Sequence, residues 1–161
     1  LVDTGEKTMT GGRIKQISKY IKNEDLFCMT YGDGVADINI KKLLIFHKKH
    51  KGLATLLAAR PQARFGALKI DKKNSVTNFE EKPEGDGGWI NGGFFILHPS
   101  TLDRIKDNNT IWEQEPLNWL AKEKQLYAYK HKGFFMPMDT LRDKVVLNNL
   151  WNDGKAKWKV W

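Results

Sequence analysis

The chain has 161 residues, with 27 Lys and Arg against 19 Asp and Glu, which gives a formal net charge of +8 at pH 7. This length is typical of one domain, and a hydrophobic fraction of 40% is enough to build a core and too high for a disordered chain. No apolar run approaches the roughly 20 residues that a membrane span requires, so we expect no membrane partner. Cys28 is the single cysteine, which excludes an internal disulfide and favours a reducing, cytoplasmic setting.

The positive charge is densest over residues 41–51, which raises the question of nucleic-acid binding. Apolar residues recur there at helical spacing with lysines on the other positions: Ile40, Leu43, Leu44 and His47. That pattern is typical of the solvated face of an amphipathic helix, and no binding motif accompanies it, so we expect no nucleic-acid partner. His47 and His50 have a spacing that can hold a metal, but no carboxylate stands beside them at matching spacing, so packing or surface histidines are favoured.

Helical and strand patterns alternate along the first third of the chain. They predict a helix over 13–21, a strand over 26–31, a helix over 38–50 capped by Asp37, and a strand over 53–59. Both strands are continuous apolar runs, which indicates burial on both faces. Strand, helix and strand in this order form a βαβ unit and predict a parallel sheet.

The remaining pattern predicts shorter elements. A β-hairpin with strands 67–70 and 76–79 precedes a polar, Gly-rich loop, and strand 90–97 contains glycines where side chains would block a neighbour. Helices over 99–105 and 115–124, strands over 126–129 and 134–136, and a helix capped by Thr140 and ended by Gly154 follow. We expect one α/β domain, with a mixed, mostly parallel sheet flanked by helices and a small β-hairpin region.

The Tyr-Gly-Asp-Gly motif at 31–34 is the most specific candidate for a functional site. Asp33 directly follows a predicted strand, at the carboxyl edge where open α/β sheets bind ligands. The flanking Gly32 and Gly34 would let a phosphate or ribose approach the backbone, and Mg²⁺ prefers a carboxylate together with phosphate oxygens. The alternative is a plain Asp-Gly turn.

A second carboxylate has the same placement. Asp139 follows a short apolar strand and precedes a helix, 106 residues after Asp33 (139 minus 33). Two carboxylates at two strand ends could share one metal. The alternative for Asp139 is a charge that simply favours the start of a helix.

Two further positions suit a phosphorylated sugar. Pro83 pushes Lys82 toward extended geometry, which would present its ammonium to a phosphate, and the neighbouring Glu81 could take sugar hydroxyls. Asn91 stands beside bare glycine backbone and suits hydroxyl recognition. A solvated loop charge and a bulged strand are the respective alternatives.

The Thr-Gly-Gly-Arg segment at 10–13 precedes a predicted helix, so its backbone N–H groups and Arg13 could hold an anion. It is neither a dinucleotide-binding fingerprint nor a P-loop. No Ser–His or Cys–His arrangement stands out, so we predict no covalent nucleophile.

Short motifs in the same order resemble the glucose-1-phosphate cytidylyltransferase family, a branch of the sugar nucleotidyltransferase superfamily. They are Val-Asp-Thr-Gly (2–5), Met-Thr-Gly-Gly-Arg (9–13), Thr-Tyr-Gly-Asp-Gly-Val (30–35), Arg-Phe-Gly-Ala-Leu (64–68), Glu-Lys-Pro (81–83), Asn-Gly-Gly-Phe-Phe (91–95), Trp-Glu-Gln-Glu-Pro (112–116) and Pro-Met-Asp-Thr-Leu-Arg-Asp-Lys (137–144). Glu-Lys-Pro occurs across the superfamily, whereas Trp-Glu-Gln-Glu-Pro points to the cytidylyltransferase branch. The resemblance implies a Rossmann-like nucleotide-diphospho-sugar transferase fold.

The resemblance also implies Mg²⁺-dependent transfer of a cytidylyl group from CTP to α-D-glucose 1-phosphate, giving CDP-glucose for bacterial dideoxysugar and surface-polysaccharide synthesis. It further implies a homo-oligomer. By position, it assigns metal binding and catalysis to Asp33 and Asp139, and catalysis to Lys82. Nucleotide contacts carry over onto Thr8, Arg13 and Gly32, and sugar-phosphate contacts onto Gly66, Glu81, Lys82 and Asn91.

The family's opening strand and its glycine-rich triphosphate loop have no counterpart in this sequence. We therefore interpret 1–161 as the later part of a single nucleotidyltransferase domain, and we expect this piece to be inactive alone. A related enzyme using UTP or dTTP, and a non-catalytic nucleotide- or sugar-phosphate-binding domain, remain as alternatives.

Overall fold

The structure, a computed structural model, describes residues 1–60, 67–80 and 88–160. The chain divides into two compact units. The first unit contains Leu1–Thr30, Ile40–Leu56 and Phe94–Tyr129, and the second contains Tyr31–Asn39, Leu57–Gly93 and Lys130–Trp161. The single domain over 1–161 stays a prediction.

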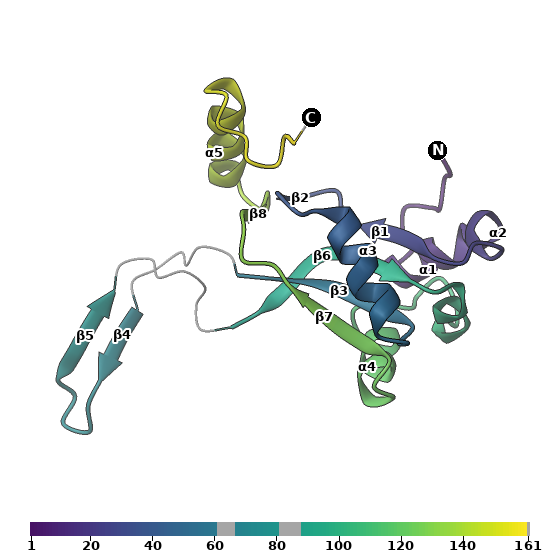
Figure 1. Ribbon diagram of the computed structural model, residues 1–161, viewed down its shortest axis with the longest axis horizontal. Coiled ribbons are helices and arrows are strands. Elements are labelled where there is room, and N and C mark those ends of the chain that lie inside the picture. The colour runs from purple at the N-terminus through teal and green to yellow at the C-terminus, as the bar shows by residue number, and fades with distance from the viewer. Residues whose placement is uncertain (61–66, 81–87, 161) are drawn as a thin grey trace. The chain divides into compact units, whose positions relative to one another are not determined.

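A four-stranded sheet has the strand order β1-β6-β3-β7 (Figure 1). Its strands are β1 (Phe27–Thr30), β3 (Ala54–Ala59), β6 (Ile90–Leu97) and β7 (Leu126–Lys130). β1 and β6 are antiparallel, with Phe27 opposite Leu97 and Thr30 opposite Phe94. The sheet therefore joins the first strand of the chain to one that is much later in the sequence.

Hydrogen bonds at the strand ends give the remaining directions. The His98 N–H, just after β6, donates to Leu53 O, just before β3, across 2.8 Å, so β6 and β3 are antiparallel. Ala54 N–H donates to Gln125 O, and His131 N–H donates to Ala58 O, so β3 and β7 run parallel. Three strands share one direction and β6 opposes them, which confirms the mixed, mostly parallel sheet. The two strands of the predicted βαβ unit are separated by β6.

β1 lies at an edge of this sheet, and the prediction that it is buried on both faces is wrong. Phe27 and Met29 are half-buried, whereas Cys28 and Thr30 are exposed. The central β3 is buried along nearly its whole length, as its apolar run predicts. The two runs look alike locally, and the sheet order decides which one becomes the edge.

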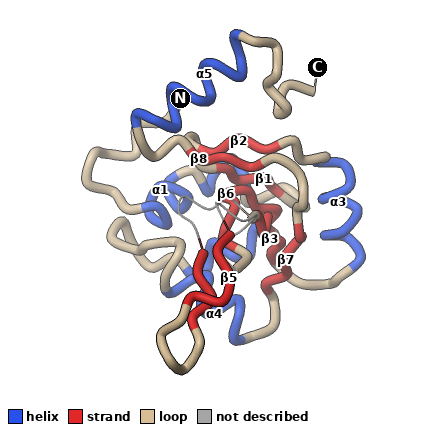
Figure 2. Tube along the Cα trace, turned by 90° about the vertical axis from the view of Figure 1, so that its left-hand side faces the viewer, coloured by secondary structure: helices blue, strands red, loops and turns tan. Residues whose placement is uncertain are grey.

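Helices flank the sheet in the first unit, where Figure 2 shows α3 on one side and α1 and α4 on the other. The helices are α1 (Thr10–Gln16), α2 (Ser18–Ile21), α3 (Ile40–Lys49), the 3₁₀ helix η1 (Pro99–Arg104) and α4 (Glu115–Lys122). Fully buried Leu43, Phe95, Trp112 and Leu120 lie in its core. The helix predicted over 13–21 instead begins at Thr10 and is interrupted at Ile17.

The second unit holds two strand pairs and a helix. β2 (Gly34–Ala36) pairs with β8 (Phe135–Pro137), and β4 (Ala67–Ile70) pairs with β5 (Val76–Glu80), the latter confirming the predicted hairpin. α5 spans Leu141–Asn152 and begins at Thr140, whose hydroxyl accepts a bond from the Asp143 N–H in a capping box. Thr140 is thus confirmed as the cap of this helix.

Replacing Gly12 by Ala is expected to destabilise the protein by about 1–3 kcal/mol. An added Cβ would lie 2.6 Å from the Asn108 backbone, and at Gly11 it would lie 2.7 Å from Thr110 O. Alanine gains about 1 kcal/mol of helix propensity, but backbone overlap of this size cannot be relieved by a side-chain rotation. Thermal unfolding of the Gly12→Ala variant measures the loss. Gly88→Ala, which faces open space, is the matched control and should leave the stability nearly unchanged.

Candidate functional site at the carboxyl edge

Asp33 lies in the turn between β1 and β2, at the carboxyl end of β1, as the sequence predicts. The Tyr31 N–H donates to Gly93 O across 2.8 Å, so this segment continues beside β6. A Cβ added to Gly32 would meet no heavy atom within 4 Å, which leaves the backbone beside Asp33 open to a ligand. The turn therefore provides an exposed carboxylate next to accessible backbone.

The β2–β8 pair brings the Asp139 segment to the same place. Gly34 lies opposite Pro137, and one step further the Met138 N–H donates to Asp33 O across 2.6 Å. Asp139 is therefore the residue directly after the hydrogen-bonded partner of Asp33. Within the described ranges no group of three or more His, Cys, Asp and Glu could hold a metal. Two carboxylates completed by substrate phosphates are, however, a donor set that suits Mg²⁺.

Asn91 belongs to the same neighbourhood through Tyr31. The amide of Asn91 donates to the Tyr31 hydroxyl across 3.3 Å, and its carbonyl oxygen accepts from the Gly93 N–H across 2.9 Å. Gly93 has a φ of +68°, and an added Cβ would lie 2.7 Å from the Tyr31 ring. Tyr31 belongs to the 31–34 motif but was assigned no role from the sequence, although a lone aromatic between a strand and a glycine turn was a usable signal.

Thr8 and Arg13 lie together in the first unit. The Arg13 guanidinium donates to Thr4 Oγ1 at 2.6 Å and to Glu6 O at 3.2 Å, and the Thr8 hydroxyl donates to Thr4 O. The Gly12 N–H donates to Thr110 O, and the Arg13 N–H donates to Met9 O. These backbone groups are used within the protein, so anion binding here would fall to the side chain of Arg13.

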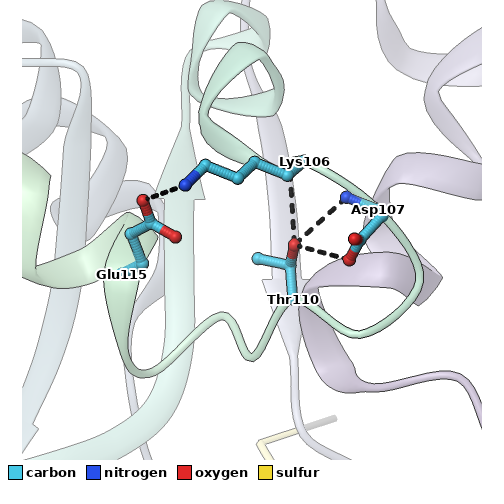
Figure 3. Close-up of polar contacts among 4 residues, drawn as sticks. All are labelled: Lys106, Asp107, Thr110 and Glu115. Carbon is cyan, nitrogen blue, oxygen red and sulfur yellow. Dashed lines mark hydrogen bonds and ion pairs between the residues drawn. The ribbon is translucent and has the colours of Figure 1, made fainter.

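The start of α1 packs against the loop around Thr110, and the Thr110 side chain holds this loop in place, as Figure 3 shows. Its hydroxyl accepts the N–H groups of Lys106 and Asp107, each across 3.2 Å. The Lys106 ammonium pairs with Glu115 Oε1 at 2.7 Å, and hydrogen bonding to this carboxylate raises the pKa of Lys106. Both side chains of that ion pair are well exposed, so it contributes little to stability. The hydroxyl of Thr110 is the main local anchor.

His47 in α3 and His50, the residue after its end, serve packing, as predicted. The side chain of His47 is buried, and its Nδ1 lies 2.8 Å from Thr55 Oγ1, while His50 Nε2 lies 2.6 Å from the same oxygen. His50 also stacks on Tyr127 with ring centroids 3.9 Å apart. One hydroxyl can donate to one nitrogen and accept from the other, so neutral imidazoles satisfy this group. Burial, followed by the charges of His50 and His98, lowers the pKa of His47 to about 4.

Asp37 differs from its prediction as a helix cap, because α3 begins three residues later, at Ile40. Its Oδ1 instead lies 2.8 Å from His131 Nε2, and its N–H donates to Phe134 O. Sequence reasoning missed this pair, since 94 residues separate its members (131 minus 37) and no local motif links them. The predicted site residues Gly66, Glu81 and Lys82 lie outside the described residues.

The segments of Asp33 and Asp139 thus lie side by side, and the backbone at Gly32 next to them is open. No helix among the described residues is long and apolar enough to cross a membrane. The family model for nucleotidyl transferases matches residues 4–157, and the chain belongs to that family.

Two curated relatives illustrate the similarity. The chain is 56% identical over 161 residues to the glucose-1-phosphate cytidylyltransferase of Salmonella typhimurium strain LT2, and this match covers 100% of the chain. It is 42% identical over 161 residues to the probable glucose-1-phosphate cytidylyltransferase of Bacillus subtilis strain 168, which covers 99% of the chain. The chain spans 62% of the length of each relative.

Solved structures support the fold. HddC from Yersinia pseudotuberculosis gives a TM-score of 0.65 at 24% identity, covering 91% of this chain and 64% of that one. A putative glucose-1-phosphate thymidylyltransferase from Bacillus anthracis gives 0.68 at 18% identity, covering 92% of this chain and 63% of that one. Both likenesses confirm the nucleotidyltransferase fold that the sequence resemblance implies.

Proposed function

We propose that the whole protein transfers a cytidylyl group from CTP to α-D-glucose 1-phosphate, releasing pyrophosphate. The observation that carries this proposal is the 56% identity over 161 residues to a protein named glucose-1-phosphate cytidylyltransferase. The juxtaposition of the Asp33 turn and the Asp139 segment supports it, because phosphoryl transfer needs a metal-binding pair at a ligand edge. CDP-glucose made in this way would supply dideoxysugar and surface-polysaccharide synthesis.

The reaction we propose is one in-line displacement. A phosphate oxygen of glucose 1-phosphate bonds to the α-phosphorus of CTP, and the bond to the bridging oxygen of the β-phosphate breaks. Mg²⁺ held by Asp33 and Asp139 would neutralise phosphate charge as it is redistributed. Asn91, oriented by Tyr31, would take a sugar hydroxyl, and Arg13 with Thr8 would contact the nucleotide. Catalysis then consists of positioning and charge neutralisation, without a covalent enzyme intermediate.

Pyrophosphate release tests the proposal. The whole protein is assayed with glucose 1-phosphate and Mg²⁺ against CTP, UTP, dTTP and GTP in turn, and then with CTP against glucose, mannose and galactose 1-phosphates. We expect kcat/KM to be at least tenfold higher for CTP with glucose 1-phosphate than for any other pair. A preference for UTP or dTTP would reassign the nucleotide. CTP binding without turnover by the whole protein would favour the non-catalytic alternative.

Lys82→Ala is expected to raise KM for glucose 1-phosphate more than KM for CTP. The resemblance implies a sugar-phosphate contact for Lys82, and losing one charge-assisted hydrogen bond costs about 1.5–3 kcal/mol, or roughly a tenfold to hundredfold change. Steady-state kinetics with each substrate varied in turn measure the two constants. Lys72→Ala, at an exposed position in the hairpin turn, is the control and should change neither. Equal increases in both KM values would contradict the role given to Lys82.

A further inference from the structure

The Asp37–His131 pair lies at one end of the β2–β8 ladder, and the candidate metal site lies at the other. Three residue pairs separate them: Gly34 with Pro137, Val35 with Met136, and Ala36 with Phe135. Beyond the first of these, Met138 N–H donates to Asp33 O, and beyond the last, Asp37 N–H donates to Phe134 O. Whatever fixes the register at the Asp37 end therefore also fixes which residue faces Asp33.

The pair itself is closely packed. His131 Nε2 lies 2.8 Å from Asp37 Oδ1 and 3.1 Å from Phe134 O. Because Phe134 O is an acceptor, Nε2 carries the hydrogen and donates to it, and the same nitrogen makes an ion-pair contact with Asp37 Oδ1. The His131 side chain is 11% exposed and that of Asp37 is 30% exposed. The Asp37 Oδ1 atom is buried without a hydrogen-bond partner among the described residues, so the approach of His131 Nε2 is a close charge contact and not a hydrogen bond.

The chain packs closely around the pair at Gly133. An added Cβ at Gly133 would overlap Asp37 Oδ1 and lie 2.8 Å from His131 Cε1, so the 131–134 segment passes directly over the carboxylate. The backbone N–H of His131 also donates to Ala58 O at the end of β3, across 2.8 Å. The approach of β8 to β2 is thereby tied both to Asp37 and to the central sheet.

A two-stranded ladder of three residue pairs needs such a tie. Short isolated strand pairs are marginal in water, and a slip by one residue turns every side chain to the opposite face. Pro137 also lacks an N–H, which removes one ladder donor. A slip of β8 would replace Met138 by a neighbour at Asp33 and would turn Asp139 away from its present face.

We propose that Asp37 and His131 are positioning residues that hold β8 in register on β2 and so place Asp139 beside Asp33 for a divalent metal. This inference rests on the metal site within the proposed function. It assigns no proton transfer and no substrate contact to the pair. The pair acts through the backbone, because the hydrogen-bonded ladder links it to the two carboxylates.

Mn²⁺ binding to the 161-residue chain, followed by electron paramagnetic resonance, tests the proposal independently of turnover. His131→Ala and Asp37→Ala should each raise the Kd for Mn²⁺ about tenfold, which is typical of residues that orient metal ligands. His131→Gln, which keeps an N–H at similar reach, should restore affinity to within threefold of wild type. Gly154→Ala strains the second unit at a φ of +69° without touching the pair, and should lower thermal stability while leaving Kd unchanged.

A cross-link provides the register control. Val35 and Met136 lie opposite each other, so cysteines at both positions, in a Cys28→Ser background, should form a disulfide in the native register. If register is the role of the pair, this cross-link restores Mn²⁺ affinity to the His131→Ala variant. Lost affinity that the cross-link fails to restore overturns the proposal. The proposal is also overturned if His131→Ala leaves the Kd for Mn²⁺ unchanged while Asp33→Asn abolishes binding. It is equally overturned if the wild-type chain has no affinity for Mn²⁺.

The two proposals fail in different ways. If the 161-residue chain binds Mn²⁺ with the expected variant pattern, but the whole protein releases no pyrophosphate from CTP and glucose 1-phosphate, the function is refuted and the positioning role stands. A protein with the expected turnover whose His131→Ala variant binds Mn²⁺ like wild type would refute the positioning role alone.

Discussion

In the whole protein, Asp33→Asn is expected to lower kcat by at least about a hundredfold while the fold is retained. An amide is a poor ligand for a hard cation, so the variant would lose much of the charge that holds Mg²⁺ against the phosphates. The structural contact at this position uses the backbone, because Met138 N–H donates to Asp33 O, and asparagine keeps that carbonyl. The exposed side chain leaves no packing to lose.

Turnover measured across an Mg²⁺ titration checks this expectation, with circular dichroism to confirm folding. Asp25→Asn is the matched control, since Asp25 is an exposed carboxylate just before the other end of β1 and should leave kcat unchanged. Asp139→Asn should behave like Asp33→Asn, and the double variant should be little worse than either, because both act on one metal. Wild-type activity of Asp33→Asn at saturating Mg²⁺ would remove Asp33 from the metal site.

Acidification is expected to destabilise the first unit through His47. Burial lowers its pKa from 6.5 to about 4 in the folded protein, so below pH 6.5 the unfolded chain binds more protons than the folded one. Stability is therefore fully present above pH 6.5, falls as the pH drops toward 4, and levels off below that. The shift corresponds to a loss of about 3 kcal/mol over this range.

Urea unfolding at a series of pH values between 8 and 4 measures the slope. His47→Gln cannot titrate, so its stability should vary much less with pH in this window. Lys48→Gln, at the neighbouring exposed position, should keep the wild-type slope. If His47→Gln shows the same pH dependence as wild type, the acid sensitivity arises from other groups.

Much of the fold could be predicted from local sequence, and the predictions that were wrong share one physical cause. β3, β6 and the hairpin were predicted because their apolar, glycine and turn residues act over a few positions. The start of α1 was missed because Gly11 and Gly12 are poor helix formers, but they fit closely against Asn108 and Thr110. Residues far away in the sequence decide where this helix begins, and a single sequence does not reveal which residues those are.

The candidate site divides in the same way. Strand-end placement predicted Asp33 and Asp139, and the structure brings their segments together, while their roles stay predictions. Asp37 was assigned to a helix cap because its true neighbour, His131, is remote in sequence. The link from Asn91 to Tyr31 joins two side chains whose distance no pattern encodes. Assignments for Gly66, Glu81 and Lys82 depend on the resemblance alone.

The antiparallel β6 between β1 and β3 also dictates when the sheet can form during synthesis. Phe27 pairs with Leu97, so 70 residues (97 minus 27) must be added before β1 acquires its hydrogen-bonded neighbour. At about 5–20 residues per second, this delay lasts about 4 to 14 seconds on the ribosome. During that interval β6 is not yet available to β1, and closing so long a loop makes their pairing slow. The pairing of β1 with β6 is therefore a late event in the synthesis of this part of the chain.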